Sequence, residues 1–111
     1  MRSFVVEAGN GNGLFGFFED NCETGYFYLY EPSGAGIIDF LHIHSKSLEL
    51  KLRKRDVAVL WSNDLLKCGV RVWGRMYGIF DLGKSEKISI SIRSVDTLPI
   101  TDPDLLSGFT E

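Results

Sequence analysis

The sequence predicts a mostly β or α+β fold: an antiparallel β meander of about seven to eight strands with at most one or two short helices. Runs of β-branched and aromatic residues recur along the chain, separated by Gly, Asn, Asp and Pro, which favour turns. Helical periodicity is nearly absent. The length of 111 residues suits one domain, covering residues 1–111, and no linker or internal repeat divides it.

Four strand-like segments occupy the first part of the chain. They cover residues 3–8, 14–20, 24–31 and 37–44. The glycines and asparagines between Gly9 and Gly13 favour a turn rather than a nucleotide-binding loop, because another strand-like segment follows them instead of a helix. In the third segment Tyr26, Tyr28 and Tyr30 alternate with apolar residues, which predicts a sheet face that displays three tyrosines.

The second part of the chain predicts a three-strand meander. Its strands are residues 57–61, 66–73 and 76–82, and a last strand follows at residues 88–92. Asn63-Asp64 is expected to form a two-residue turn, and Gly74-Arg75 a type II′ turn with Gly at the first central position. Asp102 and Pro103 predict the cap and first residue of a short helix. Ser47–Arg55 fits an edge strand, a turn of helix or a loop equally well.

Composition and charge exclude several classes of protein. The hydrophobic share of 44% and the aromatic share of 13% can form a core without a metal or a disulfide. Cys22 and Cys68 lack the spacing of zinc ligands and are expected to be unpaired thiols, and no cofactor is expected. No apolar run is long enough to span a membrane and no secretory leader precedes the first strand, so we expect a cytoplasmic protein without a membrane partner.

The net charge of −3 is unevenly distributed. Residues 1–45 carry six acidic residues and one basic residue, whereas residues 46–55 carry five basic residues and one acidic residue. The basic footprint of a nucleic-acid-binding domain is missing, so no nucleic-acid partner is expected. A charged surface of two signs is expected instead.

Several groups of residues are candidates for a functional site. Glu19, Asp20 and Glu23 place three carboxylates around one turn, which favours contact with a basic protein surface over acid–base catalysis or a hard cation. His42 and His44 are two residues apart, which on a regular strand directs both imidazoles to one face, but a third metal ligand is not evident.

The leading hypothesis is a non-enzymatic protein-binding domain, of the immunity type that neutralises a partner toxin, because no nucleophile lies in a catalytic setting. Trp61 and Trp73 can anchor a partner or pack in the core. The expected binding residues are Glu19, Asp20, Glu23, Tyr26, Tyr28, Tyr30, Trp61 and Trp73. The alternatives are a small-ligand or metal-binding domain centred on His42 and His44, and a structural subunit of a homo-oligomer that pairs through the edge Leu48–Leu52.

The segment from Phe18 to Tyr28 resembles the FEDxxxTGYFY signature of a family of short, uncharacterised bacterial proteins. The similarity continues through Leu41-His42-Ile43, Val59-Leu60-Trp61-Ser62 and Tyr77-Gly78-Ile79-Phe80-Asp81, so it covers roughly residues 15–82. The resemblance implies a bacterial origin and a compact α+β or mostly β domain. It transfers no catalytic residue.

Overall fold

The computed structural model of the protein describes residues 3–45 and 52–109. Within these ranges the chain forms eight strands, a 3-10 turn and one short helix. In chain order they are β1 (Phe4–Gly9), β2 (Phe15–Asp20), β3 (Gly25–Glu31), β4 (Gly36–His44), η1 (Lys54–Asp56), β5 (Val57–Trp61), β6 (Lys67–Val72), β7 (Arg75–Asp81), β8 (Glu86–Ser89) and α1 (Pro103–Leu106). Neither η1 nor α1 has the length and apolar character needed to cross a membrane.

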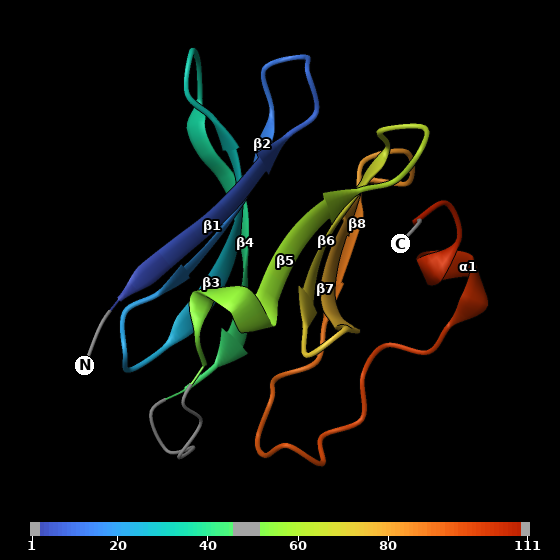
Figure 1. Cartoon of the computed structure of the whole chain (residues 1–111). Coiled ribbons are helices and arrows are strands. Elements are labelled where there is room, and N and C mark those ends of the chain that lie inside the picture. The colour runs from blue at the N-terminus through green and yellow to red at the C-terminus, as the bar shows by residue number, and fades with distance from the viewer. Residues whose placement is uncertain (1–2, 46–51, 110–111) are drawn as a thin grey trace.

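The strands form two antiparallel sheets, each a meander of consecutive strands. The first sheet has the order β1-β2-β3-β4 and the second the order β5-β6-β7-β8. Figure 1 shows the two sheets facing each other, with α1 beyond the second sheet. The predicted fold class is therefore confirmed, with four strands in each sheet.

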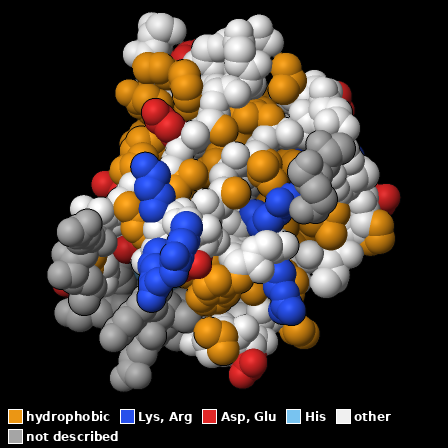
Figure 2. Space-filling view, in the orientation of Figure 1, with side chains coloured by type: hydrophobic (Ala, Val, Ile, Leu, Met, Phe, Trp, Pro, Cys, Tyr) orange, Lys and Arg blue, Asp and Glu red, His pale blue; other side chains and the backbone are white. Residues whose placement is uncertain are grey.

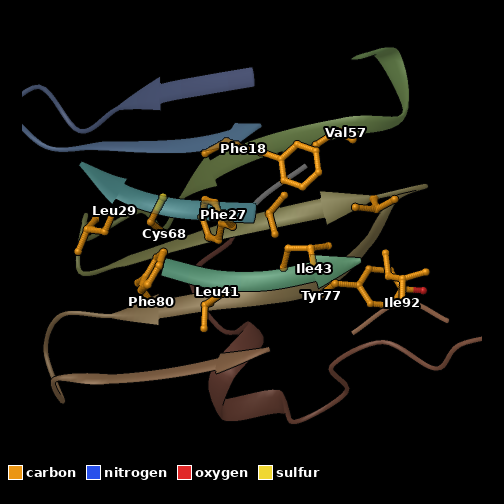
Figure 3. Packing of buried hydrophobic residues seen from close by; sticks show 13 residues of the cluster. Phe18, Phe27, Leu29, Leu41, Ile43, Val57, Cys68, Tyr77, Phe80 and Ile92 are labelled. Carbon is orange, nitrogen blue, oxygen red and sulfur yellow. The ribbon is translucent and has the colours of Figure 1, made fainter. Parts of the chain in front are cut away.

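The core lies between the sheets because alternate residues of the strands point inward. Phe18, Phe27 and Ile43 of the first sheet and Val70 of the second have no exposed surface. The rings of Phe27 and Phe80 meet across the sheets, with centroids 5.0 Å apart. Figure 3 shows Phe27, Ile43 and Phe80 among the side chains from both sheets that form one cluster.

Polar contacts join the edge strands of the two sheets on both sides of the sandwich, β1 with β5 and β4 with β8. The indole Nε1 of Trp61 on β5 donates a hydrogen bond of 2.8 Å to the carbonyl of Ala8 on β1. On the other side, the ammonium of Lys87 on β8 forms an ion pair with Asp39 on β4 at 2.5 Å. The sandwich is thus held together by polar contacts at its edges as well as by its core.

The outer face of the second sheet is covered by residues 94–109, which we call the C-terminal segment. Met76 and Ile79 are buried there against Ile100, and Leu105 and Phe109 pack on the same cluster. The ammonium of Lys67 donates to the carbonyls of Asp104 at 2.6 Å and Ser107 at 3.2 Å, which holds the end of α1 on the sheet. Asp102 caps α1 by accepting from the amide of Asp104 at 2.9 Å, as the sequence predicts.

Two predicted turns are wrong in detail. Trp73 and Gly74, with φ of 52° and 79°, are the central residues between β6 and β7, and positive φ at both positions is the mark of a type I′ turn, not type II′. The two-residue turn at Asn63-Asp64 is instead a longer connection between Trp61 and Lys67, organised by the Asp64 carboxylate, which accepts from Ser62 Oγ and the amide of Leu66.

The ambiguous segment Ser47–Arg55 lies mostly outside the described residues. Its end is described: Lys54 and Arg55 belong to η1, so this part is a 3-10 turn. The edge strand expected at Leu48–Leu52 falls outside the described residues except for Leu52, which packs partly buried against the core. Figure 2 shows several Lys and Arg side chains on the side of the molecule that carries η1 and β5, where Arg53, Lys54 and Arg55 are exposed.

Candidate functional site

The first sheet presents a continuous aromatic surface on the side away from the core. Strand register aligns its side chains in rows that run from β1 to β4. We call this surface the aromatic face; its members are Val5, Glu7, Phe15, Phe17, Glu19, Tyr26, Tyr28, Tyr30, Ile37, Phe40 and His42. One row consists of Glu7, Phe17, Tyr28 and Phe40. These residues are paired on the consecutive strands β1 to β4, so their side chains are cross-strand neighbours.

The rings of the aromatic face touch one another across three strands. Phe17 lies 5.9 Å from Tyr28 and 6.2 Å from Tyr30, measured between ring centroids. Tyr26 stacks on Tyr28 at 6.1 Å and meets the edge of Phe40 at 6.0 Å. Such contacts hold large side chains in fixed positions, so the face is a preformed surface rather than a set of independent side chains.

The aromatic face remains open in the described part of the chain. The C-terminal segment and α1 pack on the second sheet, and no helix or strand of residues 3–45 and 52–109 lies over the outer side of the first sheet. Phe40 is 52% exposed and Ile37 is 57% exposed. Exposed apolar side chains gathered on one sheet face are a common mark of an interaction site.

Two carboxylates give the aromatic face a negative charge. Glu7 and Glu19 are both exposed on neighbouring strands, and neither forms an ion pair within the described residues. The pKa of Tyr28 is raised above 10.0, first because the ring is partly desolvated and second because the charge of Glu19 opposes ionisation. At the β4 end, the hydrogen bond and charge of Lys87 lower the pKa of Asp39.

Four of the predicted binding residues meet on this face: Glu19 pairs with Tyr26 across β2 and β3, and Tyr28 and Tyr30 continue along the same side of β3. Glu23 is exposed in the turn that precedes β3. That turn is shaped by Asn21, whose side chain accepts from the amides of Glu23 and Thr24. The three tyrosines therefore share one face, as the alternation predicts.

Asp20 does not share this surface, so the expected exposed trio of acids is wrong. Asp20 has the same strand parity as Phe18 and points inward, where it is 5% exposed. Its carboxylate lies 2.9 Å from Nε2 of His44 and accepts from the amide of Cys22 at 2.7 Å. Asp20 thus organises the β2–β3 turn and the end of β4 from inside the sandwich.

The two histidines lie on opposite sides of the first sheet, so the prediction of a shared face is wrong. Gly25 pairs with His44 and Tyr26 pairs with His42, which leaves Ile43 as an extra residue in β4. This β-bulge shifts the alternation, so His44 is buried while His42 stays on the aromatic face beside Tyr26. A metal site that uses both imidazoles does not fit this geometry.

The two tryptophans lie away from the aromatic face. Trp61 is half-buried and bonds to Ala8, so it joins the sheets. Trp73 is half-buried in the β6–β7 turn and packs against the core. The core-packing interpretation of both residues fits these contacts.

The expected binding residues did not include Glu7, Phe15, Phe17 and Phe40, which belong to the same surface. Strand alternation could have identified these four residues. Each lies an even number of positions from another residue of the aromatic face on its own strand, and such residues point to the same side of a sheet. Cys22 and Cys68 are both unpaired, as predicted. Cys68 is buried, and burial raises the pKa of its thiol.

The comparisons with known proteins give one family. The chain matches none of the curated proteins and none of the solved structures. A family model described as "Uncharacterized protein conserved in bacteria (DUF2251)" matches residues 3–93, which include all eight strands of the two sheets. The chain therefore belongs to this family of uncharacterised proteins conserved in bacteria.

Proposed function

We propose that this chain is a non-enzymatic protein-binding domain that docks a partner with a basic surface on its aromatic face. We further propose that it is of the immunity type, in which binding neutralises a toxin by covering the surface the toxin uses. The observation that carries the proposal is the continuous set of contacting, partly exposed rings across β2, β3 and β4, accompanied by Glu7 and Glu19.

The chemistry of the aromatic face suits a protein partner. Tyr is enriched at binding hot spots because it buries much surface at a small cost in side-chain entropy, and Phe is enriched in the cores of protein interfaces. Phe40 and Ile37 at the β4 side are apolar and more than half exposed, whereas the tyrosines add hydroxyl groups. A mixed apolar and polar surface of this kind is typical of a protein interface.

The negative charge of the aromatic face favours a positively charged partner. Both carboxylates of the aromatic face are negative, and the whole chain carries a net charge of −3. Complementary charge raises the rate of association and disfavours acidic competitors. A basic partner is therefore the occupant that this face favours.

A nucleophile–base contact near the face, between Ser91 and His42, does not support catalysis. Ser91 Oγ lies 3.5 Å from Nδ1 of His42, at the limit of hydrogen bonding. A catalytic histidine is normally oriented by a third group, and within residues 3–45 and 52–109 no carboxylate bonds to His42. His42 instead packs against the Tyr26 ring at 5.2 Å.

Affinity capture from a bacterium that carries the protein tests the proposal. The wild-type chain is compared with a Tyr28→Thr/Phe40→Thr variant, in which Thr keeps a high strand propensity while the rings are removed. A Leu98→Thr variant is the matched control, because Leu98 is 75% exposed in the C-terminal segment. We expect a basic protein to be retained by the wild type and the control, and at least about tenfold less of it by the double variant.

The immunity role has its own readout. The captured partner, expressed alone, should inhibit bacterial growth, and coexpression of the wild-type chain but not the double variant should restore growth. Equal retention of the partner by the wild type and the double variant would refute the aromatic face as the docking surface. A partner without toxicity would refute the immunity role alone.

A further inference from the structure

One corner of the aromatic face combines a carboxylate with two stacked phenol rings. Glu19 on β2 lies directly opposite Tyr26 on β3. Tyr28, two residues further along β3, is the diagonal neighbour of Glu19. The rings of Tyr26 and Tyr28 are 6.1 Å apart with an interplanar angle of 26°, so they are nearly parallel, and both side chains are partly exposed. The charge of Glu19 acts on this corner, because it contributes to the raised pKa of Tyr28.

The protein already contains a related arrangement at the other end of the face. The ammonium of Lys87 lies 5.6 Å from the centroid of the Phe40 ring while it bonds to Asp39. One cation is thus shared by an aromatic ring and a carboxylate. The Glu19 corner offers the same two components, but within the described residues no Lys or Arg forms an ion pair with Glu19.

The geometry of the corner favours a planar cation over a compact one. A guanidinium group can lie flat on a tyrosine ring and at the same time donate two hydrogen bonds to a carboxylate, whereas an ammonium is a point charge with a stronger hydration shell. We propose that Glu19, Tyr26 and Tyr28 form a binding site for an arginine side chain of the partner protein. This inference rests on the proposed function and names the group that the aromatic face recognises.

Short peptides test the arginine site without the partner. The probes are Gly-Arg-Gly-Arg-Gly-Arg-Gly, the same peptide with lysine in place of arginine, and the same peptide with neutral citrulline. Each is titrated into the full-length protein, and amide chemical shifts are followed by NMR. We expect the arginine peptide to shift signals of β2 and β3, to bind about fivefold more tightly than the lysine peptide, and to lose its binding when citrulline replaces arginine.

Matched variants show which residues bind the arginine peptide. Glu19→Gln and Tyr28→Thr should each weaken the arginine peptide by about fivefold or more, because each removes one of the two components. Glu86→Gln makes the same change as Glu19→Gln at an exposed position of β8 and should leave binding unchanged. Thermal unfolding of each variant checks that the fold is retained.

Three results would overturn the arginine site: no shift with any peptide, equal binding of the arginine and lysine peptides, or equal binding to the wild type and Glu19→Gln. If any of these occurs while the Tyr28→Thr/Phe40→Thr variant still loses the captured partner, the docking face stands and only the arginine site fails. If that variant keeps the partner, the docking face itself fails.

Discussion

The Glu19 carboxylate and the Tyr28 phenol are coupled across β2 and β3. Partial desolvation and the charge of Glu19 both disfavour the phenolate, so the folded-state pKa of Tyr28 lies above the value of 10.0 expected in the unfolded chain. Glu19→Gln should therefore lower the Tyr28 pKa while leaving the desolvation contribution in place. Ultraviolet titration of the phenolate, with Tyr28→Phe to assign the signal, measures this. An unchanged pKa in Glu19→Gln would show that the two groups are not coupled.

The same shift gives a pH dependence of stability. Because the folded-state pKa is the higher one, the contribution of Tyr28 is fully present below pH 10.0 and is lost as the pH rises through its folded pKa. Glu19→Gln should reduce this loss of stability at alkaline pH, and Glu86→Gln should leave it unchanged. Urea unfolding below and above pH 10.0 measures the free energy of unfolding of each variant.

Asp20 and Glu19 are sequence neighbours with opposite roles. Asp20 is buried and bonded to His44 and to the amide of Cys22, whereas Glu19 is exposed. Asp20→Ala leaves buried polar groups without their acceptor and should lower the free energy of unfolding by about 1–3 kcal/mol. Glu19→Ala is the matched control and should change it by less than about 0.5 kcal/mol. Equal effects in urea unfolding would contradict the assigned roles.

At the scale of elements, Gly16 fixes how closely β2 approaches the second sheet. An added Cβ would lie 2.7 Å from Val59 Cγ1 and closer still to the Cys68 sulfur. Gly16→Ala should therefore cost about 1–3 kcal/mol of stability through overpacking. Gly83→Ala is the control, because a Cβ there meets its nearest atom at 3.4 Å. If the two variants unfold at the same urea concentration, the sheets can separate more easily than this packing indicates.

The strands were predictable because each has its own local signal. Alternating side chains and β-branched residues defined β1 to β7 to within about two residues, and Asp102-Pro103 defined the start of α1. The turns were less predictable, since the φ values of Trp73 and Gly74 depend on which residues of β6 and β7 pair. The bulge at Ile43 depends on the pairing of β3 with β4, so the burial of His44 could not be derived from β4 alone.

The candidate site was predictable only in part. The alternation of Tyr26, Tyr28 and Tyr30 indicated an aromatic surface on one strand. Phe17 and Phe40 join that surface through strand order and register, which are long-range properties of the sheet. Asp20 was expected at the surface because it lies beside a turn, but its parity with Phe18 directs its side chain inward.

At the scale of the whole molecule, the two sheets differ in what lies outside them. The C-terminal segment, which follows the residues matched by the family model, covers the second sheet through Ile100 and Phe109. The first sheet lies on the opposite side of the sandwich (Figure 1), and its outer side carries Phe40, which is exposed, and rings that are partly exposed. Because of this asymmetry, we propose docking on the first sheet and a structural role for the outer face of the second.

Site-specific photo-cross-linking in living bacteria tests that assignment most directly. A photoreactive phenylalanine analogue replaces Phe40 on the aromatic face or, as the control, Leu98 in the C-terminal segment; both positions are exposed, so both report on what approaches them. We expect a discrete cross-linked species with a basic protein from position 40 and none from position 98. Cross-linking of a partner from position 98 alone, or none from position 40, would contradict it.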